Sequence, residues 1–153
     1  MLAMFVYGTL KRGERNHERY CSSARHAEEG AVRGKLYDLP HFAYPELIVP
    51  EESVRALGTN EYAGDVELQE RLSRERQPTL EGPMVFGEIS FFDDPASRLP
   101  AIDRLEGFDP ADASSQYRRV LLSVAAEGRT LLAWAYAVRE PSGTFLPDGR
   151  WPP

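Results

Sequence analysis

Glu106 is the side chain of this 153-residue chain whose type and position best suit acid/base chemistry. The segment from Ala96 to Glu106 is predicted to be a helix, and Gly107 ends it because glycine tolerates the left-handed conformation that often closes a helix. Successive helical residues turn by about 100°, so Leu99, Ile102 and Glu106 share one narrow stripe. That stripe should face the core, where a carboxylate is unusual.

Two physical effects would raise the pKa of a carboxyl group at this position. Burial disfavours the charged form, and the last turn of a helix carries partial negative charge that opposes a second negative charge. A carboxyl group with a raised pKa can take up and return a proton near neutral pH, as a general acid/base must. Two structural interpretations stay open: Glu106 bonds a nearby backbone group or Arg119, or it lies at the rim of the stripe. Its position alone favours these structural roles over catalysis.

The other segments predict an α+β fold, because strands dominate and do not alternate strictly with helices. Strands are expected at 2–7, 31–37, 84–92, 117–125 and 130–138, with shorter extended pieces at 46–49 and 53–57. Glu127 and Gly128 join the last two strands in a hairpin. A short helix is expected at about 16–22, and a polar, solvent-exposed helix at 65–76 with Asp65 as its N-cap.

Length and composition suit a single domain over residues 1–153. Its last stretch, 140–153, is expected to be irregular because it holds four prolines and two glycines. The net charge of −6 and the pI near 5.1 disfavour nucleic-acid and anionic-membrane partners, which require a basic face. No apolar run approaches the length of a bilayer, and no signal peptide is evident. Together with a single cysteine, Cys21, these features favour a soluble, cytoplasmic protein.

Other chemistries find little support in the sequence. The three histidines, His17, His26 and His41, lack the spacing of metal ligands, and one cysteine cannot form a thiolate cluster, so no metal site is expected. The cysteine also lacks an adjacent activating group. Glu88 and Glu106 would be the carboxylate pair of a glycosidase, but no other feature indicates sugar binding. The fingerprints of serine hydrolases, P-loops and dinucleotide-binding folds are absent.

An ordered series of short motifs resembles the γ-glutamylcyclotransferase-like superfamily, which includes AIG2-like proteins and γ-glutamylamine cyclotransferases. The opening motif is FVYGTLKRG at Phe5–Gly13. The further motifs, in the order of the superfamily, are GKLYDLP at 34–40, Tyr44-Pro45, GEI at 87–89, IDRLEG at 102–107, YRR at 117–119 and AWAY at 133–136. Each motif is weak alone, but the ordered set is specific for the superfamily.

The resemblance implies a small mixed β-barrel flanked by helices, with a cavity that holds a γ-glutamyl compound. The implied reaction is intramolecular: the α-amine of the substrate attacks its own γ-carbonyl, which gives 5-oxoproline and a released amine or amino acid. No metal or organic cofactor is implied. Glu106 would be the general acid/base. The substrate-binding residues would be Tyr7, Gly8, Thr9, Leu10, Tyr44, Tyr117 and Tyr136.

Several of these residues also have structural interpretations. Gly8 would form a tight turn, and the backbone N–H groups that follow can bind a carboxylate or a developing oxyanion. Tyr117 and Tyr136 would contact substrate through their hydroxyl groups or be core aromatics with satisfied hydroxyls. Arg119, on the same strand face as Tyr117, suits an ion pair better than a substrate contact.

The segment 53–83 looks enlarged relative to the most compact members of the superfamily. It would cover the pocket or extend a surface for a partner, so the motifs do not determine which γ-glutamyl compound is the substrate. The rival function is a non-catalytic small-molecule-binding or regulatory protein on the same scaffold, and a third is an interaction module built on 53–83. The protein is expected to be a monomer or a weak homodimer.

Overall fold

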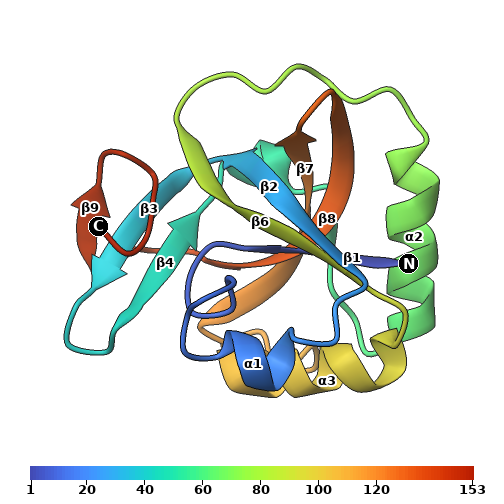
Figure 1. Cartoon of the computed structure of the whole chain (residues 1–153), viewed down its shortest axis with the longest axis horizontal. Coiled ribbons are helices and arrows are strands. Elements are labelled where there is room, and N and C mark those ends of the chain that lie inside the picture. Colours follow the sequence, from blue (N-terminus) through green and yellow to red (C-terminus); the bar gives the residue numbers. More distant parts are fainter.

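Five strands form a closed barrel in the computed structural model, which describes all residues from 1 to 153 (Figure 1). The barrel strands are β1 (Leu2–Val6), β2 (His26–Arg33), β6 (Met84–Phe92), β7 (Tyr117–Ala126) and β8 (Arg129–Val138). Their order is β2-β6-β1-β8-β7, and a further pairing of β7 with β2 closes the ring. Neighbouring strands are antiparallel except β1 and β8, which are parallel. The expected mixed β-barrel is therefore confirmed.

A second, three-stranded sheet lies beside the barrel, at the left of Figure 1. It consists of β4 (Tyr44–Ile48), β3 (Lys35–Leu39) and β9 (Thr144–Leu146), in the order β4-β3-β9. The single strand predicted at 31–37 is wrong, because the chain passes from β2 to β3 at Gly34. A Cβ atom at Gly34 would lie 2.6 Å from the carbonyl oxygen of Ile48, so only glycine fits at this passage.

Two other sequence predictions need correction. The extended piece expected at 53–57 contains only the two-residue strand β5 (Ala56–Leu57), which follows a 3₁₀ turn at Glu51–Ser53 and pairs with β7. The tail expected to be irregular is so except for the three-residue strand β9, and its Trp151 is buried. The Trp151 indole N–H donates to Asp38 Oδ1 at 3.0 Å. Contacts with β3, which local sequence patterns do not reveal, order this tail.

Three helices flank the barrel, as expected. α1 (His17–Tyr20) and α3 (Pro95–Glu106) lie together at one end, and α2 (Tyr62–Ser73) packs along β8 (Figure 1). Gly107 follows α3 with a φ of 70°, and Gly128 forms the β7–β8 turn with a φ of 73°. The predicted helix end and hairpin are therefore confirmed. None of the helices combines the length and the apolar character that a bilayer crossing requires.

The central position of β1 explains why its apolar run is buried on both faces. Ala3 and Phe5 belong to the cluster of strand residues that fills the barrel, whereas Leu2, Met4 and Val6 belong to the cluster between the barrel and the helices. Alternate side chains of a strand point to opposite faces, and here both faces are covered. All five residues of β1 are buried as a result, and the chain that leaves Val6 starts from the middle of the core.

α2 is not the solvated surface helix that the sequence predicts. It begins at Tyr62, so Asp65 lies in its first turn rather than at its N-cap, and both Asp65 and Gln69 are buried. Gln69 accepts a hydrogen bond from the Ala3 N–H at 2.9 Å and donates one to the Met1 carbonyl at 3.0 Å. Polar groups can be buried where they find hydrogen-bond partners, and hydrophobic patterning does not detect such a face.

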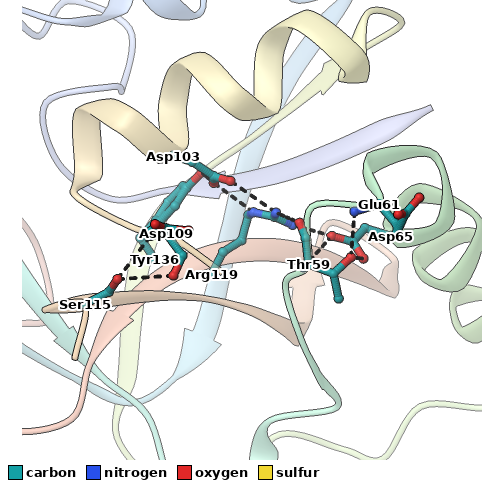
Figure 2. Close-up of polar contacts among 8 residues, drawn as sticks. All are labelled: Thr59, Glu61, Asp65, Asp103, Asp109, Ser115, Arg119 and Tyr136. Atoms are coloured by element: carbon teal, nitrogen blue, oxygen red, sulfur yellow. Dashed lines mark hydrogen bonds and ion pairs between the residues drawn. The ribbon is translucent and has the colours of Figure 1, made fainter. Parts of the chain in front are cut away.

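A buried cluster around Arg119 joins both long helices to the barrel (Figure 2). The Arg119 side chain on β7 is fully buried, and its Nε donates to Asp103 Oδ1 of α3 at 2.9 Å. Its Nη1 donates to Asp65 Oδ2 of α2 at 2.8 Å, and its Nη2 donates to the Thr59 carbonyl at 2.7 Å. The Tyr136 hydroxyl of β8 donates to Asp103 at 2.5 Å. Buried charges are tolerated when they are paired and hydrogen-bonded, and this cluster meets that condition.

Arg119→Met should lower the free energy of unfolding by about 3–5 kcal/mol, because two buried carboxylates lose their cation. Urea unfolding followed by circular dichroism measures this loss, with Arg71→Met on the exposed side of α2 as the control. Adding Asp65→Asn and Asp103→Asn to Arg119→Met should restore part of the stability, since no charge then stays buried. A loss below about 1 kcal/mol for Arg119→Met would contradict the stabilising role of the cluster.

Candidate active site

Glu106, the last residue of α3, lies where two cavities meet. The inner cavity has a volume of about 40 Å³ and lies between the loop that follows β1 and the start of β4. An open depression of about 410 Å³, the mouth, adjoins it on the outside. Thr9, Tyr44 and Glu106 line both. The Glu106 carboxylate thus borders both the narrow inner cavity and the wider mouth.

The structure brings all the residues selected from the sequence to these two cavities. The inner cavity is lined by Glu106 and by Tyr7, Gly8, Thr9, Leu10, Tyr44 and Tyr136. Tyr117 lines the mouth. Their roles in catalysis and in substrate binding stay predictions. Pro45, which the sequence presents only as part of the Tyr44-Pro45 motif, also lines the inner cavity.

Glu106 is a partly buried carboxylate that makes no hydrogen bond or ion pair with the protein. Burial raises the pKa of its carboxyl group from 4.5 to about 7, because the charged form loses hydration and gains no compensating partner. The alternative in which Glu106 bonds Arg119 is wrong, since Arg119 pairs with Asp103 and Asp65. Near neutral pH this carboxyl group can therefore both accept and donate a proton.

The loop after β1 presents free backbone donors to the inner cavity. The N–H groups of Gly8, Thr9 and Leu10 donate to no acceptor in the protein. The loop is held by its carbonyl groups instead: Lys11 N–H donates to the Gly8 carbonyl at 3.1 Å, and Asn16 N–H donates to the Thr9 carbonyl at 2.9 Å. Successive free N–H groups of this kind can bind a carboxylate or an oxyanion.

Close approach of β4 explains the glycine at position 8. A Cβ atom on Gly8 would lie 2.7 Å from Cδ and 2.8 Å from Cγ of the Pro45 ring, which is closer than real Cβ atoms come. The tight turn expected from the sequence is present, because Lys11 N–H donates to the Gly8 carbonyl, but the φ angle of Gly8 is not in the left-handed region, so the turn alone does not require glycine. The absence of a side chain lets the loop and β4 enclose the cavity together.

Three of the four tyrosines at the site donate their hydroxyl proton to an acceptor within the protein. Tyr7 donates to the Tyr136 carbonyl at 2.6 Å, Tyr136 donates to Asp103, and Tyr117 donates to the Pro45 carbonyl at 2.9 Å. Burial raises the pKa of all three phenols above their usual value, so they stay protonated at neutral pH. Each can still accept a hydrogen bond from a ligand. These hydrogen bonds fix the walls of the site.

Sequence reasoning missed two buried carboxylates near the site, Asp103 and Glu46. Asp103 lies one turn before Glu106 on α3 and takes the arginine. Glu46 on β4 accepts hydrogen bonds from the N–H groups of Ser142 at 2.8 Å and Gly143 at 2.9 Å, which ties the chain after β8 to β4. For Glu46, the signal in the sequence was a carboxylate within an otherwise apolar strand. For Asp103, it was a second carboxylate three residues before Glu106 on the same helix.

Several residues considered in the sequence lie outside the site. Cys21 is buried, and burial raises the pKa of its thiol to about 12, so it is a poor nucleophile. Glu88 forms an ion pair with Arg12 at 2.9 Å and lines neither cavity. No group of three or more histidine, cysteine or acidic side chains is arranged to hold a metal ion. The segment 53–83 contributes no residue to either cavity, so of its two expected roles the structure offers no support for that of a pocket cover.

Comparison with known proteins identifies relatives in sequence. The family model described as gamma-glutamyl cyclotransferase, AIG2-like, matches residues 4–75 and 68–153. A gamma-L-glutamyl-butirosin B gamma-glutamyl cyclotransferase of Niallia circulans is 27% identical over 134 residues. This match covers 87% of the chain and 64% of the relative, so the chain spans less than two thirds of the length of that protein.

Two solved structures share the fold. YkqA from Bacillus subtilis has a TM-score of 0.59 and 21% sequence identity, and the match covers 98% of this chain and 39% of YkqA. The uncharacterised protein PH0828 from Pyrococcus horikoshii has a TM-score of 0.56 and 18% identity, with 99% of this chain and 90% of PH0828 covered. At these identities the likeness supports the fold alone, a small mixed β-barrel flanked by helices.

The raised pKa of Glu106 predicts a pH-dependent difference in stability between the wild type and Glu106→Gln. Between pH 4.5 and about 7 the folded wild type binds more protons than the unfolded chain, so its free energy of unfolding falls as the pH rises. The glutamine variant lacks this linkage. Relative to the wild type it should gain about 3 kcal/mol between pH 4 and pH 8. Urea denaturation at both pH values checks this, and an equal difference at the two values would contradict the raised pKa.

Proposed function

Because the chain belongs to the gamma-glutamyl cyclotransferase, AIG2-like family, we propose that it converts the γ-glutamyl group of a small molecule into 5-oxoproline and releases an amine or amino acid. Glu106 is the general acid/base of this reaction. The observation that carries the proposal is a carboxylate without a protein partner, with a pKa raised to about 7, that shares a cavity with the free N–H groups of the loop after β1.

The proposed reaction begins with removal of a proton from the substrate. The α-ammonium group must lose a proton before its nitrogen can attack, and an ionised carboxylate at hydrogen-bond distance accepts it. The nitrogen then bonds to the γ-carbonyl carbon, and the bond from that carbon to the leaving nitrogen breaks. The two protons that the α-ammonium loses end on the released amine, with Glu106 as the carrier. The reaction consumes no water, oxidant or cofactor.

The loop after β1 supplies the electrostatic part of the proposal. Attack on the γ-carbonyl places negative charge on its oxygen, and fixed N–H donors stabilise that charge without having to reorganise. The N–H groups of Gly8, Thr9 and Leu10 are suited to this role because they have no acceptor in the protein. Since amine and carbonyl belong to one molecule, holding the substrate in a folded conformation supplies the rest of the rate enhancement.

The tyrosines would bind and orient the substrate rather than transfer protons. Their raised pKa values keep Tyr7, Tyr117 and Tyr136 protonated. The hydroxyl oxygen of Tyr117 can accept a hydrogen bond from the α-ammonium group, since its own proton is donated to the Pro45 carbonyl. Tyr44, whose ring lies 6.5 Å from that of Tyr117, covers the boundary between the inner cavity and the mouth.

Glu106→Gln should abolish release of 5-oxoproline, with a loss of at least about 100-fold, because glutamine cannot accept the proton. The measurement is a screen of γ-glutamyl dipeptides, glutathione, γ-glutamyl-ε-lysine and γ-glutamyl amines, with 5-oxoproline quantified by mass spectrometry. Glu67→Gln, on the exposed side of α2, is the matched control and should keep full activity. Circular dichroism verifies that both variants are folded.

The pH profile of the wild type tests the same assignment. Since the base must be ionised, kcat/KM should fall as the pH drops through about 7. A folded Glu106→Gln protein with near-wild-type turnover would show that another group is the base. A folded wild type that releases no 5-oxoproline from any of these compounds would favour the rival function, a non-catalytic small-molecule-binding protein.

Gly8→Ala should lower kcat by about tenfold to a hundredfold, because the added methyl group meets the Pro45 ring and displaces the N–H donors. Gly64→Ala on α2 is the control, since a Cβ atom there has its nearest neighbour at 3.8 Å. Steady-state rates with the best substrate of the screen provide the measurement. Unchanged kcat in Gly8→Ala would remove the loop from the proposed mechanism.

A further inference from the structure

The mouth of the site carries two arginines that have no carboxylate partner. Arg15 and Arg104 both line it, and neither forms an ion pair within the protein. Glu106 is the only acidic side chain that lines the mouth, and it is not bonded to either arginine. In a protein with a net charge of −6, the outer side of the site is therefore locally basic.

The exposed Arg15 guanidinium makes one hydrogen bond within the protein and has other donors free. Its Nη2 donates to the carbonyl of Phe42, in the β3–β4 turn, at 3.3 Å. A guanidinium group has five N–H donors in a planar arrangement that matches a carboxylate. Four of these donors make no hydrogen bond within the protein. Gln116, which lines the mouth on another side, offers an additional amide donor.

The dimensions of the two cavities determine which part of a substrate meets the arginines. The inner cavity, at about 40 Å³, holds only a few heavy atoms, whereas the mouth has about ten times that volume. The reacting carbon must lie close to Glu106 and to the N–H groups after β1. The group on the far side of the bond that breaks, which leaves as the amine, therefore extends into the mouth.

The two arginines of the mouth do not account for the raised pKa of Glu106. Burial is the only cause that shifts the pKa of Glu106, and it raises that pKa. A nearby cation would have lowered it. Neither arginine forms an ion pair with Glu106, so the carboxylate of Glu106 does not neutralise their charges.

We infer that Arg15 and Arg104 bind a carboxylate on the leaving group, so that the substrates are γ-glutamyl amino acids or peptides rather than γ-glutamyl derivatives of neutral or cationic amines. This inference rests on the proposed function, because it assigns the leaving group of that reaction to the mouth. Arginine–carboxylate contacts are charge-assisted and bidentate, which gives both affinity and selectivity.

The test compares γ-glutamyl-alanine with γ-glutamyl-alaninamide, which differ only in the charge of the leaving group. The wild type should prefer the carboxylate compound by at least about tenfold in kcat/KM, mainly through KM. In Arg15→Gln/Arg104→Gln this ratio should fall toward one. Arg76→Gln, beyond the end of α2 and remote from both cavities, should keep the ratio of the wild type.

Binding to Glu106→Gln, measured by titration calorimetry, repeats the comparison without turnover. If the wild type releases no 5-oxoproline but Glu106→Gln binds the carboxylate compound more tightly, and the arginine substitutions remove that preference, the proposed function fails and the binding of a ligand carboxylate by the two arginines stands. If turnover occurs but both compounds react equally well, or the arginine substitutions slow both equally, the inference is overturned and the proposed function stands. Absence of any preference in turnover or in binding also overturns it.

Discussion

The ion pairs of Arg119 with Asp103 and Asp65 are the interaction on which the rest of the structure depends. They fix α3 and α2 against β7, and they use the fully buried Arg119 guanidinium, which is then not available to Glu106. Asp103 and Glu106 lie one turn apart on α3, yet only Asp103 reaches the arginine. Glu106 is left without a counter-charge, so burial alone sets its pKa. On α3, Asp103 is therefore a structural carboxylate because it pairs with Arg119, and Glu106 is available for chemistry because it has no partner.

The same cluster is connected to the walls of the site. Tyr136 donates its hydroxyl to Asp103, and its carbonyl accepts the hydroxyl of Tyr7. Tyr7 begins the loop whose next three N–H groups are free, and Pro45 closes over Gly8. A short series of hydrogen bonds therefore runs from the buried ion pairs to the open donors. Fixed donors of this kind are valuable in catalysis because they need not move when charge develops.

Local signals explain which parts of this fold could be predicted from the sequence. Gly107 and Gly128 mark the end of α3 and the β7–β8 turn because each adopts a left-handed conformation, and the apolar stripe on α3 places Glu106 correctly. Signals from distant residues were inaccessible. The break at Gly34 depends on a carbonyl group of β4. The buried polar face of α2 depends on Arg119, which lies more than fifty residues further along the chain.

Part of the outer side of the site is built from loops. Arg15 belongs to the loop before α1, Gln116 to the loop before β7, and Phe42 to the β3–β4 turn, whereas Arg104 belongs to α3, as Glu106 does. Substitutions in loops cost less stability than substitutions in packed elements. Arg15 and Gln116 can therefore be exchanged at little cost in stability, whereas Arg104 shares its helix with Glu106. A change of substrate preference can therefore arise from a few loop substitutions, each of which leaves the protein folded.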